Sequence, residues 1–130
     1  MPYFMYVALQ GDDKILTFKM DPDSGKLEPQ EGIAISGGPA PLAVDPQRRY
    51  LYAGSRGSKE LSSFSIDQKT AGLSLIGTVP LETDSVYLAT DRKGRFLLSA
   101  YYEGSMVTVH TIGEDGAVMD PPVQTLPTAR

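Results

Sequence analysis

The chain is built from one unit of sequence that repeats every 46 residues. Phe4, Tyr50 and Phe96 occupy equivalent positions, since 50 − 4 and 96 − 50 both equal 46. Further equivalent sets are Tyr6, Tyr52 and Leu98; Ala8, Gly54 and Ala100; Phe18, Phe64 and His110; Met20, Ile66 and Ile112; and Leu27, Leu73 and Met119. A register kept over most of the chain predicts that each repeat folds as the same supersecondary unit.

Each repeat has the pattern of four short strands separated by turns. In the second repeat, apolar or alternating runs predict strands at residues 42–45, 50–55, 61–67 and 73–81. In the third repeat, the corresponding runs are residues 86–90, 96–101, 106–112 and 119–126. The first repeat begins directly at its second strand, residues 4–8, and continues through residues 14–20 and 27–36.

Four-stranded units of about 40–50 residues are typical of β-propeller blades. We therefore expect an all-β fold, a partial β-propeller of about three four-stranded antiparallel blades, in one domain over residues 1–130. Blade one, lacking its innermost strand, is expected at residues 4–36, blade two at 40–82 and blade three at 85–126. A β-sandwich is the other all-β possibility, but it does not require a strict repeat.

A propeller ring closes with about 4–8 blades, so three blades cannot close one alone. The chain is therefore expected to be part of a longer protein. Alternatively, copies could associate as a homo-oligomer through their exposed blade faces, which would otherwise leave apolar surface and strand edges uncovered.

The amino-acid composition and net charge exclude several kinds of partner and site. A hydrophobic fraction of 41% and a charged fraction of 22% are typical of a folded chain. The net charge of −4, with scattered Lys and Arg, argues against a nucleic-acid partner. The absence of cysteine excludes disulfides and thiolate metal sites. No apolar run approaches the roughly 20 residues that span a bilayer, and no signal peptide is evident, so we expect a cytoplasmic location and no membrane partner.

Several motifs resemble those of one family. Residues 45–52 (DPQRRYLY) and 91–98 (DRKGRFLL) resemble a D-P-x-G-R-F-L turn signature. Residues 18–27, 101–110 and 116–124 resemble the patterns F-x-x-D-P-x-T-G-x-L, N-Y-x-x-G-S-V-x-V and G-x-x-x-x-P-V-Q. Together, these motifs resemble the lactonase-type seven-bladed β-propellers, which include 6-phosphogluconolactonase and 3-carboxy-cis,cis-muconate lactonizing enzyme, over the N-terminal part of that fold.

The resemblance implies a function for the whole protein. It implies an enzyme, either a lactonase or a carboxymuconate cyclase, that acts on a small anionic lactone or carboxylate in the central channel, with no cofactor and no metal. Two positions depart from the family: residues 86–88 read VYL where a C-H-L pattern is common, and Tyr101 stands at the Asn of the N-Y pair. The catalytic residues are expected beyond residue 130, so the fragment itself is expected to be inactive.

The substrate-binding candidates are the residues expected near the inner strands of blades two and three. They are Arg56, Tyr87, Tyr101, Tyr102 and Glu103. A guanidinium matches the geometry of a carboxylate or phosphate. The alternative is that the tyrosines pack between blades and that Arg56 is solvated.

The single histidine is not a substrate-binding candidate. His110 is expected to be a partly buried residue filling an aromatic position rather than a general base, because it shares its register with Phe18 and Phe64. A non-catalytic binding or scaffold module is the alternative to an enzyme, since fold alone does not determine function.

Overall fold

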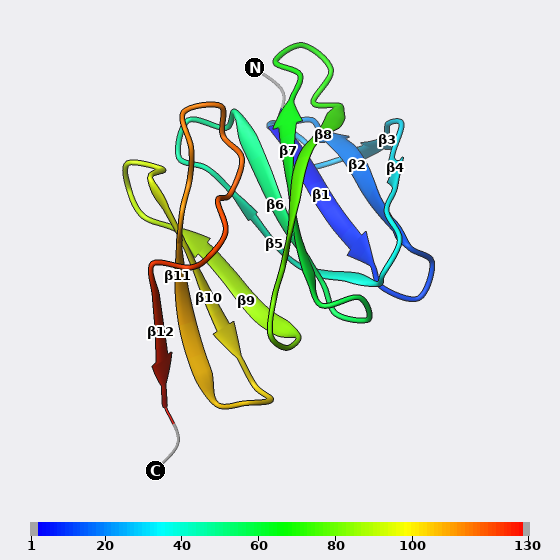
Figure 1. Cartoon of the computed structure of the whole chain (residues 1–130). Coiled ribbons are helices and arrows are strands. Elements are labelled where there is room, and N and C mark those ends of the chain that lie inside the picture. The colour runs from blue at the N-terminus through cyan, green and yellow to red at the C-terminus, as the bar shows by residue number, and fades with distance from the viewer. Residues whose placement is uncertain (1–2, 129–130) are drawn as a thin grey trace.

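The computed structural model describes residues 3–128, which form three antiparallel β-sheets arranged side by side (Figure 1). No helix occurs in this range, and therefore none that could cross a membrane. The two ends of the domain expected over residues 1–130 lie outside the described residues. The all-β fold with three four-stranded sheets confirms the fold class predicted from the repeat.

Blades two and three are consecutive four-stranded meanders. Blade two has the order β5 (Pro39–Val44), β6 (Tyr50–Ser55), β7 (Glu60–Ile66) and β8 (Leu73–Pro80). Blade three has the order β9 (Ser85–Thr90), β10 (Phe96–Tyr101), β11 (Met106–Thr111) and β12 (Gln124–Pro127). Each strand pairs with its sequence neighbours, as short connections between antiparallel strands require.

Blade one consists of β1 (Tyr3–Leu9), β2 (Lys14–Met20), β3 (Leu27–Pro29) and β4 (Ile33–Ala34). Both β3 and β4 pair with β2, so they share the place of one outer strand. The run predicted as continuous over residues 27–36 is interrupted at Gln30–Gly32, where the chain approaches β2. A Cβ on Gly32 would lie only 2.7 Å from the carbonyl oxygen of Ile15, so this approach requires glycine.

The last strand of blade three is also shorter than predicted. It begins at Gln124 rather than at residue 119. Val118 instead forms an isolated bridge with Ile112, and the proline pair at residues 121–122 separates this bridge from β12. Proline lacks a backbone donor, so the ladder cannot continue through the pair.

The D-P-x-G-R turn signature corresponds to an aspartate that closes the turn between the first two strands of a blade. Asp45 Oδ1 accepts hydrogen bonds from the backbone N–H groups of Arg49 (2.6 Å) and Tyr50 (3.0 Å). Asp91 Oδ1 makes the equivalent bonds to Arg95 (2.7 Å) and Phe96 (3.0 Å). These backbone donors, Phe96 foremost, hold the pKa of Asp91 below its ordinary value.

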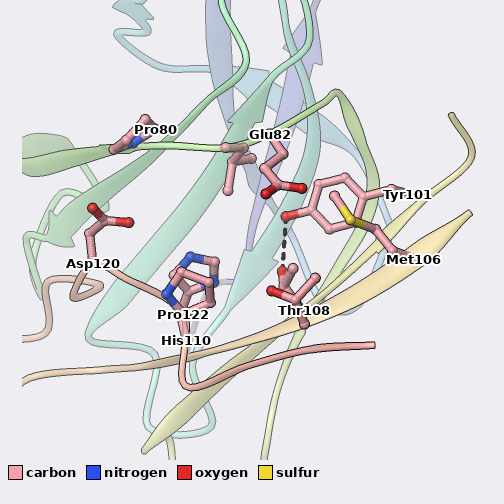
Figure 2. A pocket seen from close by; sticks show the side chains of 10 residues that line it. Pro80, Glu82, Tyr101, Met106, Thr108, His110, Asp120 and Pro122 are labelled. Atoms are coloured by element: carbon pink, nitrogen blue, oxygen red, sulfur yellow. Dashed lines mark hydrogen bonds between the residues drawn. The ribbon is translucent and has the colours of Figure 1, made fainter. Parts of the chain in front are cut away.

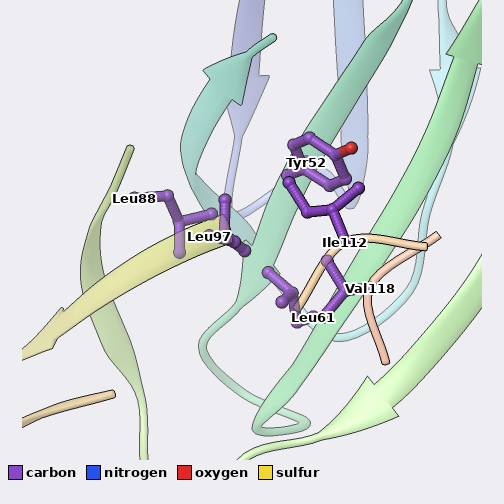
Figure 3. Close-up of a cluster of buried hydrophobic side chains, with 6 residues drawn as sticks. All are labelled: Tyr52, Leu61, Leu88, Leu97, Ile112 and Val118. Atoms are coloured by element: carbon purple, nitrogen blue, oxygen red, sulfur yellow. The ribbon is translucent and has the colours of Figure 1, made fainter. Parts of the chain in front are cut away.

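Two apolar cores lie between the blades. Because side chains alternate between the two faces of a strand, each blade presents one set of residues to each neighbour. The first core lies between blades one and two and contains Ile15, Leu51, Ala53 and Phe64. The second lies between blades two and three (Figure 3) and contains Tyr52, Leu61, Leu88, Leu97, Ile112 and Val118.

A tyrosine hydroxyl forms a hydrogen bond from blade one to blade two, and an equivalent one forms a hydrogen bond from blade two to blade three. Tyr6 Oη donates to the carbonyl oxygen of Ala71 in blade two (2.6 Å). Tyr52, at the equivalent position of blade two, donates to the carbonyl oxygen of Gly116 in blade three (2.7 Å). Burial raises the pKa of Tyr6 to about 12 and raises that of Tyr52 as well, so both hydroxyls remain donors at neutral pH.

The outer faces of blades one and three carry exposed apolar side chains. On blade one, Tyr3 and Met5 are 53% and 41% exposed. On blade three, Phe96 and Leu98 are 39% and 43% exposed. Leu98 stands at the position of Tyr6 and Tyr52 and has no hydroxyl to offer a further blade.

Candidate functional site

The innermost strands of blades two and three begin with the same irregularity. Pro39 pairs with Ser55 and Leu42 with Ala53, which leaves one extra residue in β5. In β9, Ser85 pairs with Tyr101 and Tyr87 with Ala100, again leaving one extra residue. A bulge redirects side chains, and Tyr87 is 65% exposed at this point.

The turns after the second strands gather at the edge where these bulges lie. In Figure 1 the β1–β2, β6–β7 and β10–β11 turns and the β8–β9 connection lie along the lower edge. The three turns share one conformation, because Asp13, Lys59 and Ser105 occupy equivalent positions and have φ values of 51°, 56° and 46°. Arg56, Tyr102 and Glu103 are therefore carried to the edge at which β5 and β9 begin.

Backbone contacts with the preceding linker fix the position of Arg56. Its N–H donates to the carbonyl oxygen of Gly38 (2.9 Å), and the N–H of Gly57 donates to that of Gly37 (2.7 Å). The Arg56 side chain is half-buried rather than fully solvated. Its Nε is buried and has no hydrogen-bond partner among residues 3–128.

The start of β9 places two further polar groups beside the end of β6. A Cβ on Gly54 would overlap Ser85 Oγ, so only glycine allows this close approach. Asp84 Oδ1 and Ser85 Oγ are buried, and neither has a partner in the described part of the chain. Such groups are rare because each loses its hydration without a compensating bond.

We call Arg56, Asp84, Ser85 and Tyr87 the rim cluster. It combines a cationic donor, a carboxylate, a hydroxyl and an exposed aromatic ring at one end of blades two and three. A guanidinium binds phosphate or carboxylate, while carboxylate and hydroxyl groups bind sugar hydroxyls. The arrangement suits a small polar, anionic ligand.

The five sequence-predicted residues are divided among different places. Arg56 and Tyr87 belong to the rim cluster, and Tyr102 (81% exposed) and Glu103 lie on the β10–β11 turn at the same edge. Tyr101 is only 6% exposed, and its hydroxyl lies 2.9 Å from Thr108 Oγ1. Tyr101 thus lines the space between blades two and three.

Asp84 and Ser85 were not predicted from the sequence, although the repeat contains a signal for them. They occupy the positions of Gly38 and Pro39, 46 residues earlier. Gly38 has φ +74° and serves the backbone geometry of its linker. A glycine and a proline in blade two are thus replaced by an aspartate and a serine in blade three, which indicates that the two polar residues have a role specific to blade three.

His110 is buried more completely than predicted, because only 1% of the residue is exposed, and it occupies the aromatic position of its repeat. Burial lowers its pKa, and the negative charge of Asp120 opposes that shift. Its Nδ1 is buried without a hydrogen-bond partner among the described residues.

The repeated four-stranded blades define the chain as part of a β-propeller. The family described as "Lactonase, 7-bladed beta-propeller" matches residues 4–128, and the chain belongs to this family. The 6-phosphogluconolactonase of Serratia proteamaculans is 33% identical over 121 residues, which cover 93% of this chain and 36% of that protein. The chain therefore spans only about a third of such a relative.

Solved structures support the same fold. A putative 6-phosphogluconolactonase from Bacteroides uniformis superposes with a TM-score of 0.86 at 28% identity, covering 97% of this chain and 38% of that one. The periplasmic gluconolactonase of Pseudomonas aeruginosa superposes with a TM-score of 0.85 at 22% identity, covering 97% of this chain and 37% of that one. The latter similarity concerns the fold alone.

Proposed function

We propose that this chain forms the N-terminal blades of a longer propeller lactonase and that its rim cluster binds a sugar lactone bearing an anionic group. The observation that carries the proposal is a set of buried, unpartnered polar atoms: those of Asp84 and Ser85 beside the bulge of β9, and Arg56 Nε beside the start of β5. The names of the relatives support 6-phosphogluconolactone as the first substrate to test. The muconate-cyclising alternative gains no support from these names.

Each rim residue has a role that follows from its chemistry. Arg56 binds the phosphate, because a guanidinium offers several donors in one plane. Asp84 and Ser85 bind sugar hydroxyls, and the exposed ring of Tyr87 covers one face of the sugar. In the reaction, water adds to the lactone carbonyl and the ring C–O bond breaks to give the open acid.

The proposal assigns substrate binding to this chain and catalysis to the further blades. The exposed apolar faces of blades one and three fit this division, because further blades of the same kind would cover them. The 130-residue chain alone is therefore expected to have no appreciable lactonase activity.

A chimera tests this proposal. This chain replaces the matching N-terminal third of the Serratia proteamaculans relative, and hydrolysis of 6-phosphogluconolactone is followed by acid release. We expect activity in the chimera and none in the chain alone. Activity of the isolated chain, or a folded but inactive chimera, would contradict the proposal.

A substitution in the chimera tests the role of Arg56. Arg56→Ala should raise KM by about tenfold or more, since a charge-assisted hydrogen bond is lost. Arg92→Ala is the matched control, because Arg92 is exposed in the β9–β10 turn at the opposite edge. Equal KM values for the two variants would remove Arg56 from the binding site.

A further inference from the structure

A second cavity lies between blades two and three, apart from the rim cluster. Its volume is about 290 Å³, near the lower end of the roughly 300–1,000 Å³ typical of small-molecule sites. Blade two and the linker that leaves it contribute Pro80, Leu81 and Glu82, and blade three contributes the remaining lining. The cavity is therefore built entirely from residues of this chain.

The charged groups that line the cavity are all acidic. Glu82 and Asp120 supply carboxylates, and no lysine or arginine belongs to the lining. Figure 2 shows Asp120 on one side of the pocket and Glu82 with Tyr101 on the other. Both carboxylates belong to exposed residues, so they remain in contact with water. An anionic ligand would be repelled here, whereas a cation would be attracted.

His110 provides an independent sign of a ligand. It lines the cavity, it is 1% exposed, and its Nδ1 has no partner among residues 3–128. A buried ring nitrogen without a partner is costly, and a bound group would remove that cost. In the equivalent positions of blades one and two the chain has Phe18 and Phe64, so the polar ring is specific to this interface.

The rest of the lining limits the size and character of the ligand. The hydroxyls of Tyr101 and Thr108 are hydrogen-bonded to each other. Their oxygens can still accept a hydrogen bond from a ligand. Leu81, Met106 and Pro122 supply apolar surface between the polar groups. The complementary ligand has a short aliphatic body and a cationic donor at each end.

We propose that this inter-blade cavity binds a small aliphatic diammonium ion, with one ammonium group donating to Asp120 and to Nδ1 of His110 and the other donating to Glu82. The site is independent of the lactone site, since no residue of the rim cluster lines it. Putrescine, a four-carbon diamine, is the probe. Butylamine keeps one ammonium group, and 1,4-butanediol keeps the length without charge.

The single histidine gives a direct readout of occupancy. The chain contains one His, so the ring signals of His110 in an NMR spectrum need no assignment by mutation. Addition of putrescine to the 130-residue chain should shift these signals in a saturable way, and calorimetry should give one site per chain. Butylamine should bind about tenfold more weakly, and 1,4-butanediol should not bind.

Substitutions distinguish putrescine binding in the cavity from general electrostatic attraction to an acidic chain. Asp120→Asn and Glu82→Gln should each weaken putrescine binding by about tenfold, since each removes one charged acceptor. Glu114→Gln, which removes an exposed carboxylate outside the cavity, should leave the affinity unchanged. The proposal is overturned if the His110 signals do not move, if butylamine and putrescine bind equally, or if all three variants weaken binding alike.

Discussion

The two inter-blade interfaces have the same construction but a different polar content. Both have an apolar core and a tyrosine hydroxyl that donates to a carbonyl of the next blade. Six buried side-chain atoms lack a partner in the described residues, and none belongs to blade one. Four of the six belong to blade three or to the linker before it: Asp84, Ser85, Ser99 and His110.

The number of unpartnered polar groups therefore distinguishes an interface that mainly holds two blades together from one that also carries proposed binding sites. The interface between blades one and two leaves fewer buried polar atoms without a partner, among them Ser55 Oγ on the face of β6 that carries Leu51 and Ala53. The interface between blades two and three keeps groups that destabilise the fold unless something binds to them. Both proposed sites, the rim cluster and the diammonium cavity, lie beside this second interface.

Gly116→Ala should have the largest effect on the second interface. A Cβ on Gly116 would overlap the ring of Tyr50, and Gly116 has φ +90°. We expect the free energy of unfolding to fall by about 3 kcal/mol in chemical denaturation. Gly11→Ala is the control, because a Cβ there meets no atom within 4 Å. A similar small change in both variants would show that the turn adjusts freely and that the interface is loosely packed.

The tyrosine contacts give a smaller effect that compares the two interfaces directly. Tyr52→Phe removes the donor to a carbonyl on buried Gly116 and should cost about 1–2 kcal/mol of unfolding free energy. Tyr6→Phe should cost about 1 kcal/mol or less, since Tyr6 is only half-buried. A larger loss of unfolding free energy in Tyr6→Phe than in Tyr52→Phe would contradict the prediction that the tyrosine bond contributes more at the second interface. Urea denaturation of both variants measures the difference.

His110 should make the second interface sensitive to acid. Burial lowers its pKa in the folded state, so the unfolded chain binds more protons at mildly acidic pH. Stability from this group is complete above the unfolded pKa of about 6.5 and falls as the pH drops below it. Wild type should therefore lose more stability between pH 7.5 and 5.5 than His110→Phe. Equal losses would show that His110 is protonated without penalty.

Much of the fold was readable from the sequence because the repeat supplies independent copies of each strand. Residues 14–20, 50–55 and 96–101 were predicted with the observed limits of β2, β6 and β10. Two errors fell in outer strands, at Gln30–Gly32 and before Gln124, where glycine and proline end the pairing locally. Periodicity alone does not locate such interruptions. Another error fell in an innermost strand, because β5 begins at Pro39 rather than at residue 42.

The candidate site was less readable, because its residues depart from the repeat. Arg56 and Tyr87 were found through their positions near the inner strands. Asp84 and Ser85 were missed because they precede the run of residues 86–90 that predicted the strand, and β9 begins one residue earlier. Tyr101 shares the buried face of β10 with Leu97 and Ser99, so the ordinary alternation of that strand places it between the blades.

The most direct test of the account measures stability and activity together in the chimera. Ser85→Ala removes a buried hydroxyl and Asp84→Asn removes the charge of a carboxylate with a buried oxygen; neither group has a partner in the described chain, so the account predicts an unchanged or higher melting temperature. It also predicts that kcat/KM for 6-phosphogluconolactone falls by about tenfold, because Ser85→Ala loses a hydrogen bond to the substrate and Asp84→Asn loses the charge that strengthens one. Unchanged activity in both variants, or a loss that parallels a fall in melting temperature, would contradict the assignment of the second interface to function.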